Sequence, residues 1–359
     1  MQLVAYGAQD VYLTGNPQIT FFKVVYRRHT NFSMEAIEQT INGSQVQDGS
    51  GSVTISRNGD LVHKVYVTSA TPGIENGSEI VNSVDLEIGG QLIDRQTAEW
   101  MQVVNELNTP ESKAIGLKAM QGDVGTSQVV GGTGVGLVQV PLQFYFCRNP
   151  GLALPLIALQ YHEVKLKCSW GAATCTTRSV FCDYIYLDTD ERRRFAQVSH
   201  EYLIEQVQFS NTLNAGKGLG ANAGAVAASA AVNTQHELRF NHPVKELVWT
   251  LHDGTDNKDV TAEDALLQLN GHDRFKRREG KYFTNVQRYQ HHSGSGNSGA
   301  AGDSVPHIYS FALKPEEHQP SGTCNFSRID NAVLNMEHAT VTAPATLKVY
   351  AVNYNVLRI

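Results

Sequence analysis

The chain repeats itself at a shift close to half its length. Residues 86–90 (LEIGG) recur as residues 267–271 (LQLNG), and residues 37–39 (IEQ) recur as residues 204–206. Strand-like segments late in each half match in the same order, so a duplicated fold is the interpretation that covers all of these matches together. We therefore expect three pairs of equivalent residues: Ile37 with Ile204, Ile88 with Leu269, and Tyr184 with Val352.

The repeated segments alternate between apolar and polar residues. Val84, Leu86 and Ile88, for example, are separated by Asp85 and Glu87. Because successive side chains of a strand point to opposite faces, this alternation predicts strands with one buried face. Similar segments cover residues 137–146, 161–167, 180–187, 308–313, 328–336 and 347–354. Helical periodicity is limited to residues 97–107 and 189–197, so the expected class is all-β.

The length of 359 residues exceeds the size at which a single hydrophobic core stops growing, which is about 250–300 residues. Two domains are therefore expected. The duplication places them at residues 1–188 and 200–359, joined by a charged linker at residues 189–199 that lacks strand alternation. Each half suits a jelly roll or an immunoglobulin-like sandwich, and the latter is the weaker interpretation because the required Cys, Trp and Cys spacing is missing.

Three stretches are rich in glycine and small residues: residues 121–136, 214–231 and 293–302. They hold few bulky apolar side chains that could be buried, so they are expected to form surface loops. Loops of this length between strands usually carry contacts with other molecules.

The charge balance argues against a general nucleic-acid-binding protein. Lys and Arg total 29 against 35 Asp and Glu, a formal net charge of -6, whereas nucleic-acid binding needs a basic face. No direct genome binding is therefore expected. The N-terminal residues lack the basic and apolar regions of a signal peptide, and no run of 18 apolar residues occurs, so we expect synthesis in the cytosol and no membrane span.

The five cysteines are odd in number and none belongs to a C-x-x-C pair. Neither a disulfide framework nor a zinc knuckle is indicated. Buried or half-buried free thiols are the expectation for all five: Cys147, Cys168, Cys175, Cys182 and Cys324.

No set of residues has the spacing of a catalytic, cofactor-binding or metal site. The glycines of residues 132–136 precede a predicted strand, whereas a dinucleotide site needs a helix N-terminus, and Lys217 lacks the following Ser or Thr of a P-loop. His162-Glu163 and His200-Glu201 begin like zinc-protease motifs but lack the second His. No His-x-His pair of a metal-binding jelly roll occurs, so no cofactor is expected.

Charged clusters have plain interpretations. The pair His291-His292 lies in a Ser, Gly and Asn context and is expected to be solvated. The basic runs at residues 192–194 and 276–278 are expected to be solvated or to form inter-domain salt bridges. Sequons begin at Asn31, Asn42, Asn76 and Asn325, and without a secretory signal we do not expect the standard glycosylation pathway to use them.

Several long segments resemble the major capsid proteins of nucleocytoplasmic large DNA viruses, closest to the algal chlorovirus and phycodnavirus members. They are residues 3–43, 55–61, 150–166, 183–197, 200–209, 311–332 and 349–359. These segments run from one end of the chain to the other, which makes the resemblance specific.

The resemblance implies a structural protein of the virion, without enzymatic activity, built from two tandem eight-stranded jelly rolls. It also implies a homotrimer with a pseudo-hexagonal outline, whose partners are neighbouring capsomers and minor capsid and penton proteins, with glycans as a further partner. Residues 5–30 would be basal, and loops within residues 101–140, 210–235 and 290–303 would form outer or inter-subunit surface. The chain is shorter than typical relatives, mainly through reduced loops in its second half.

Alternatives from other classes remain at this point. A jelly-roll glycan-binding or host-attachment protein of the virion surface would use an aromatic-lined loop groove. A minor capsid or penton protein would use one jelly roll, which the duplication disfavours. A cupin-type enzyme would require a bound metal.

Overall fold

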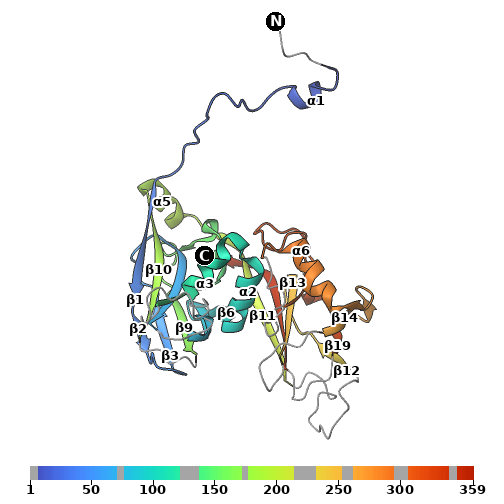
Figure 1. Cartoon of the computed structure of the whole chain (residues 1–359). Coiled ribbons are helices and arrows are strands. Elements are labelled where there is room, and N and C mark those ends of the chain that lie inside the picture. Colours follow the sequence, from blue (N-terminus) through green and yellow to red (C-terminus); the bar gives the residue numbers. More distant parts are fainter. Residues whose placement is uncertain are drawn as a thin grey trace.

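Two β-sandwiches stand side by side in the computed structural model of the chain, and a long N-terminal arm leaves one end of the first sandwich (Figure 1). The structure describes residues 7–70, 77–121, 137–171, 177–213, 232–252, 262–294, 306–338 and 346–359. The arm contains one short helix, α1 (Val11–Thr14), and otherwise runs free of the sandwiches.

The first sandwich consists of two antiparallel sheets. One has the strand order β1-β10-β4-β7, with β8 also pairing with β4, and the other has the order β2-β3-β9-β5-β6. The first sheet contains β1 (Phe32–Gln39), β10 (Arg178–Leu187), β4 (Leu61–Ala70), β7 (Leu137–Pro141) and β8 (Leu154–Pro155). The second contains β2 (Ile41–Gly43), β3 (Ser50–Thr54), β9 (Val164–Trp170), β5 (Val81–Ile88) and β6 (Gln91–Thr97).

The second sandwich repeats this plan. Its sheets have the orders β11-β20-β13-β17, with β18 pairing with β13, and β12-β19-β14-β15, with β16 pairing with β14. The first of them contains β11 (Glu201–Leu213), β20 (Thr346–Arg358), β13 (Pro243–His252), β17 (His307–Ser310) and β18 (Cys324–Asn325). The other contains β12 (Val232–Glu237), β19 (Ala332–His338), β14 (Ala262–Leu269), β15 (His272–Asp273) and β16 (Arg278–Glu279).

Both sandwiches have the jelly-roll topology. In the first sandwich, the first strand β1 pairs with the last strand β10, which also pairs with β4. In the second sandwich, β11 pairs in the same way with β20, which also pairs with β13. The four principal strands of every sheet keep this order in both copies, which confirms the predicted fold of two tandem jelly rolls.

The ladders show which residues are equivalent in the two copies. Tyr184 pairs with Val62, and Asn353 pairs with Val244 at the same point of the corresponding ladder. The expected match of Tyr184 with Val352 is therefore wrong by one residue, which would turn the side chain to the other face of the sheet.

The expected match of Ile37 with Ile204 is also wrong. Ile37 pairs with Cys182, two residues before Tyr184. The corresponding position two residues before Asn353 is Ala351, which pairs with Gln208. The match of Ile88 with Leu269 holds, because each residue ends its strand directly before a hairpin turn and pairs with the first residue after that turn.

Helices fill the ends of the sandwiches. Both predicted helices form, as α2 (Ala98–Asn108) and α5 (Thr189–Gln197), the second lying in the predicted linker. The side chain of Thr97 caps α2 by accepting a hydrogen bond of 3.3 Å from the N–H of Trp100. The other helical segments are α3 (Glu111–Gln121), α4 (Tyr145–Arg148), α6 (Gln287–His291), η1 (Gly77–Ile80), η2 (Pro150–Leu152), η3 (Tyr282–Val286) and η4 (Phe326–Arg328).

The strand expected at residues 137–146 is shorter than predicted. It ends at Pro141, and Tyr145–Arg148 forms the helix α4 instead. The physical reason is that Phe144, Tyr145 and Phe146 are all buried, so this segment has no polar face to alternate with an apolar one. Among the described residues, no helix is both long and apolar enough to cross a membrane.

Candidate functional site

The junction between the two jelly rolls is the most elaborate polar and apolar site in the described part of the chain. Strand β6 at the edge of the first jelly roll lies against β11 at the edge of the second. The side-chain amide of Gln206 donates to the carbonyl of Ile93, and the backbone N–H of Val207 donates to the Asp94 carboxylate at 3.1 Å. Hydrogen-bonding groups of the two edge strands are thus paired with each other where β6 meets β11.

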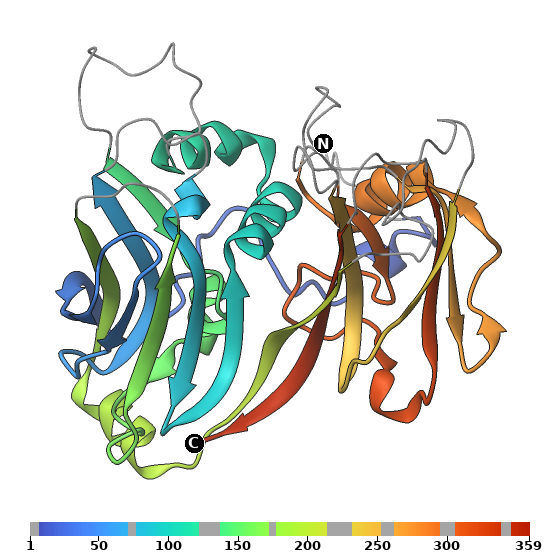
Figure 2. The same cartoon turned by 90° about the horizontal axis from the view of Figure 1, so that it is seen from below.

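An apolar seam continues the junction. Trp100, Val103, Val104 and Leu107 of α2 pack against Val248, Ile308, Tyr350 and Val352 of the second jelly roll. The rings of Trp100 and Tyr350 have centroids 5.0 Å apart, and Phe209 stacks on Tyr350 at the same distance. Figure 2 shows α2, in teal, at the seam between the two bodies. Burial of this seam joins the jelly rolls into one block.

The segment at residues 288–294 closes over the C-terminal end of α2. The guanidinium of Arg288 donates to the Glu106 carbonyl at 3.1 Å and lies 3.2 Å from the Glu106 carboxylate. The N–H of Gly294 donates to the Leu107 carbonyl at 2.7 Å. The last carbonyls of a helix have no hydrogen-bond donors within the helix. Here Arg288 and Gly294 of the second jelly roll donate to those of α2.

A buried charge network lies beside this seam. The Glu205 carboxylate accepts from Arg148 at 2.9 Å and from Lys245 at 2.9 Å, and only 2% of the Lys245 side chain is exposed. The Lys245 ammonium also donates to the Pro315 carbonyl at 2.5 Å. Buried ions are costly to desolvate, so a complete set of partners fixes one arrangement of the jelly rolls.

His292 is buried in the same region, and the expectation that it is solvated is wrong. Its Nε2 atom lies 3.2 Å from the Glu246 carboxylate, and Nδ1 lies 3.4 Å from that of Glu316 and 3.1 Å from the Asn108 side-chain oxygen. Burial lowers the pKa of His292, but the two carboxylates outweigh burial and raise that pKa to about 9. The imidazole is therefore a cation at neutral pH.

Asp94 is the opposite case. Burial raises its pKa to about 6, although the N–H of Val207 and the charge of Arg148 favour the carboxylate form. The Asp94 carboxyl group, which joins β6 to β11, therefore titrates at about pH 6.

The remaining residues that the sequence singled out lie apart from this network. Glu163 pairs with Lys165 at 2.7 Å, the ring of His200 contacts the Phe195 carbonyl at 2.9 Å, and Glu201 pairs with Arg358 at 2.9 Å. The glycine segments at residues 132–136 and 216–218 lie outside the described residues, as do most of the three predicted loops. Within the described ranges, no group of three or more His, Cys, Asp or Glu residues is arranged to hold a metal ion.

The basic runs form ion pairs within the chain. Arg192 of α5 lies 3.0 Å from the Asp60 carboxylate, which precedes β4. Arg277 lies 2.6 Å from Asp264 and 3.2 Å from Glu337, both in the second jelly roll. The pairs of Arg277 are therefore internal to one jelly roll and do not bridge the two.

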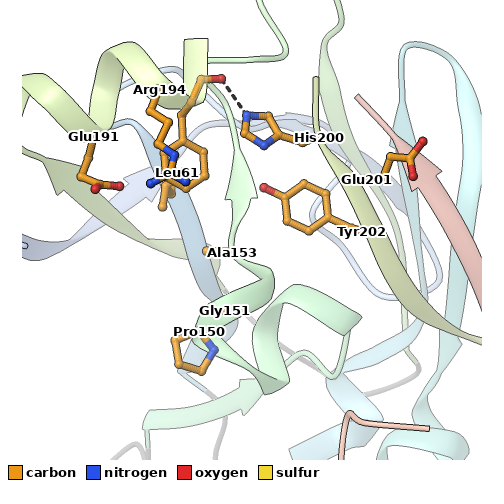
Figure 3. A pocket seen from close by; sticks show the side chains of 10 residues that line it. Leu61, Pro150, Gly151, Ala153, Glu191, Arg194, His200, Glu201 and Tyr202 are labelled. Carbon is orange, nitrogen blue, oxygen red and sulfur yellow. Dashed lines mark hydrogen bonds between the residues drawn. The ribbon is translucent and has the colours of Figure 1, made fainter. Parts of the chain in front are cut away.

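A depression of about 420 Å³ opens at the arm-proximal end, where both jelly rolls meet α5 (Figure 3). Its lining comes from α5, from the turn at Pro150–Leu152 and from the first residues of β11. Phe195, His200 and Tyr202 form a short stack along it. The lining is mixed, with apolar, aromatic and charged side chains.

The cysteines in the described part of the chain are free, with Cys147, Cys168 and Cys182 buried and Cys324 half-buried, as expected. Burial raises the pKa of Cys147 and of Cys168 to about 12, so these thiols are protonated at neutral pH. Cys175 lies outside the described residues.

Comparison with solved structures defines the class of protein. The crystal structure of PBCV-1 VP54, fitted into a cryo-EM reconstruction of the virophage Sputnik, matches with a TM-score of 0.81 and 37% identity, covering 95% of this chain and 97% of that chain. The Faustovirus major capsid protein shares the fold, with a TM-score of 0.74 at 12% identity, over 99% of this chain and 94% of its own. The fold is that of a double jelly-roll viral capsid protein.

Comparison with protein families narrows that class. The model for the major capsid protein N-terminus matches residues 20–177, and the model for the large eukaryotic DNA virus major capsid protein matches residues 191–359. The major capsid protein of Pyramimonas orientalis virus is 50% identical over 399 residues, covering 100% of this chain and 96% of the relative. The chain belongs to the large eukaryotic DNA virus major capsid protein family.

Membership of this family fixes the role of the chain. It is a structural protein of the virus particle and not an enzyme. The comparisons give no support to the alternative of a glycan-binding or host-attachment protein.

Proposed function

We propose that the chain divides at residues 1–188 and 200–359, with a linker at 189–199, and assembles as a homotrimeric capsomer with a pseudo-hexagonal outline. The observation that carries the proposal is that two jelly rolls of the same strand order are fused side by side through a buried junction. Three such chains around a three-fold axis present six similar units, which can tile a hexagonal lattice.

Neighbouring capsomers, minor capsid proteins and penton proteins are the partners that this assembly requires. The depression around Phe195, His200 and Tyr202 supports contact at the arm-proximal end, because aromatic side chains with polar tips are enriched at protein interfaces. Glycans are a further proposed partner. We propose synthesis in the host cytoplasm before incorporation into the capsid, without direct genome binding, because the chain has a net charge of -6.

Native mass spectrometry of the purified full-length chain tests the proposal. The expected main species has three times the chain mass of 39.4 kDa and persists on dilution to micromolar concentration. A monomer as the main species at that concentration would overturn the capsomer proposal.

A further inference from the structure

The N-terminal arm exposes an unusual amount of apolar surface. Large apolar residues throughout residues 11–26 are more than half exposed, including Phe22 at 98% and Tyr26 at 88%. Within this arm, residues 19–26 (ITFFKVVY) consist almost entirely of β-branched and aromatic residues, which favour strands. An exposed apolar segment of this kind marks an interaction site, because water disfavours it when it is left uncovered.

An acceptor for a strand lies on the same end of the molecule. Strand β1 is an edge of its sheet, and among the described residues no strand pairs with its outer side. Its eight residues equal residues 19–26 in length. An open edge presents unpaired N–H and C=O groups that can take up an additional strand.

The two faces of β1 match the two faces of the arm segment. Phe32, Met34 and Ala36 lie on the outer face. Beside them is a depression of about 510 Å³, lined by apolar side chains, including Ile185 and Leu187, and by His63, Lys64 and Asp183. Residues 20, 22, 24 and 26 share one face of an extended segment, so Phe22 and Tyr26 would cover the apolar part of this surface.

The opposite face is matched in charge. Glu35 lies on the other face of β1, because Tyr184, which pairs with it, belongs to the core. Lys23 falls on the opposite face of the arm segment from Phe22. Within residues 7–31 the cations Lys23, Arg27 and Arg28 outnumber the single carboxylate, Asp10, although the whole chain has a net charge of -6.

We propose that residues 19–26 of one chain add as a strand to the outer edge of β1 in a second copy of this chain. The arm then covers the Phe32 and Met34 surface and places Lys23 beside Glu35. This proposal deepens the proposed self-assembly by naming the segments that join two copies. The arm leaves the body in Figure 1, which suits exchange between chains.

Cysteine cross-linking between two populations of the full-length chain tests the exchange. One population carries Phe22→Cys and the other Met34→Cys, both with Cys175→Ser and Cys324→Ser, and the two are mixed before assembly. Mild oxidation should give a two-chain product. The control pairs Phe22→Cys with Tyr289→Cys, a position on α6 that is more exposed than Met34 but lies in the other jelly roll, and should give little product.

Hydrogen exchange of residues 32–39 gives an independent readout. Lys23→Glu should speed their exchange by about ten-fold relative to the unmodified chain, and Lys23→Glu with Glu35→Lys should restore protection. Equal cross-linking at Tyr289→Cys would overturn the proposal. A third sample, the double variant Phe22→Cys with Met34→Cys, tests the alternative. Cross-linking within its single chains, with no two-chain product from the mixed populations, would also overturn the proposal, because it indicates a hairpin with the chain's own β1. Protection of the arm only by anionic lipid vesicles, with unchanged exchange in β1, would overturn it in favour of a membrane contact.

The exchange and the capsomer proposal can fail separately. Native mass spectrometry of the same samples reports the number of chains, whereas the cross-link reports only the arm. A three-chain species without the cross-link would sink the arm proposal and leave the capsomer proposal intact.

Discussion

The Asp94 carboxylate in the first jelly roll accepts a hydrogen bond of 3.1 Å from the backbone N–H of Val207 in the second. This contact crosses the junction between β6 and β11, and Asp94 is only 3% exposed. A carboxylate in this position joins the two edges but loses its water when the jelly rolls close.

The first prediction concerns the pH dependence of this contact. The pKa of Asp94 is raised to about 6 in the folded chain, above about 3.9 for the unfolded one. The stabilisation from this group is therefore fully present below about pH 4 and is lost as the pH rises through about 6. Asp94→Asn keeps the acceptor for Val207 and cannot ionise. The variant should be more stable than the unmodified chain at pH 8, by on the order of 2 kcal/mol, and the difference should disappear toward pH 4.

Urea unfolding at a series of pH values measures this difference. Because both chains share all other titrating groups, only the change between them is informative. A variant that is less stable than the unmodified chain at pH 8 would show that the charge of Asp94 stabilises the junction.

The second prediction concerns His292, which holds Glu246 and Glu316 as a buried cation. His292→Ala removes the buried cation between these carboxylates, although Glu316 still accepts a hydrogen bond of 2.7 Å from the N–H of Ser293. The change should cost about 3–5 kcal/mol at pH 7. The matched control is His291→Ala, since the neighbouring His291 is half-buried and its Nδ1 atom lies 3.1 Å from the Leu313 carbonyl oxygen, with no ion pair to a described carboxylate. That control should change stability by less than about 1 kcal/mol.

The pH dependence of His292 has the same sign as that of Asp94 but falls in a higher pH range. Its folded pKa of about 9 lies above about 6.5 for the unfolded chain, so its stabilisation is complete below about pH 6.5 and is lost as the pH rises through about 9. Unfolding free energies of the unmodified chain and His292→Ala should therefore converge between pH 7 and pH 9.5. A constant difference over that range would contradict the ionised pair.

The third prediction concerns Gly294, where the second jelly roll caps α2. A Cβ atom at this position would lie 2.2 Å from the Glu106 carbonyl oxygen and 2.4 Å from that of Leu107. Gly294→Ala should therefore push the cap off α2 and destabilise the chain by about 1–3 kcal/mol. Gly116→Ala, in the exposed part of α3 with open space around it, is the control and should stabilise by about 0.5–1 kcal/mol. Thermal unfolding of both variants compares them, and equal effects would remove the steric argument.

The fourth prediction concerns the thiols. All five cysteines should be reduced, and thiol counting in denaturant should return five per chain. In the native chain, Cys147, Cys168 and Cys182 should react far more slowly with a thiol reagent than Cys324, because they are buried. A count of one thiol per chain in denaturant would indicate two disulfides.

The sequence predicts equivalent positions of the two jelly rolls best where the backbone conformation restricts which residue types are allowed. Gly89-Gly90 and Asn270-Gly271 all have positive φ, between 51° and 83°, in the turns after β5 and β14. Hairpin turns of this kind demand Gly or Asn, so the match of LEIGG with LQLNG identifies equivalent positions. No backbone conformation restricts the residue types at Ile37–Gln39. The match of this tripeptide with residues 204–206 therefore does not identify equivalent positions of β1 and β11.

The junction could be predicted only in part. The apolar stripe of α2 is visible in the sequence, but its partners Tyr350 and Val352 lie in the last strand. Likewise, the burial of His292 depends on Glu246 and Glu316, which are distant along the chain and converge only in the folded state. Helix α3 is not predicted by the sequence because seven of its eleven residues are exposed, which leaves only a weak apolar stripe at Ala114, Leu117 and Met120.

A single-particle cryo-EM reconstruction of the purified capsomer, computed without imposed symmetry, would show the assembly itself. We expect three chains around a three-fold axis, with six jelly rolls in a ring and α2 at the seam within each chain. A reconstruction that shows a single chain, or a ring in which the two jelly rolls of each chain are separated, would contradict this expectation.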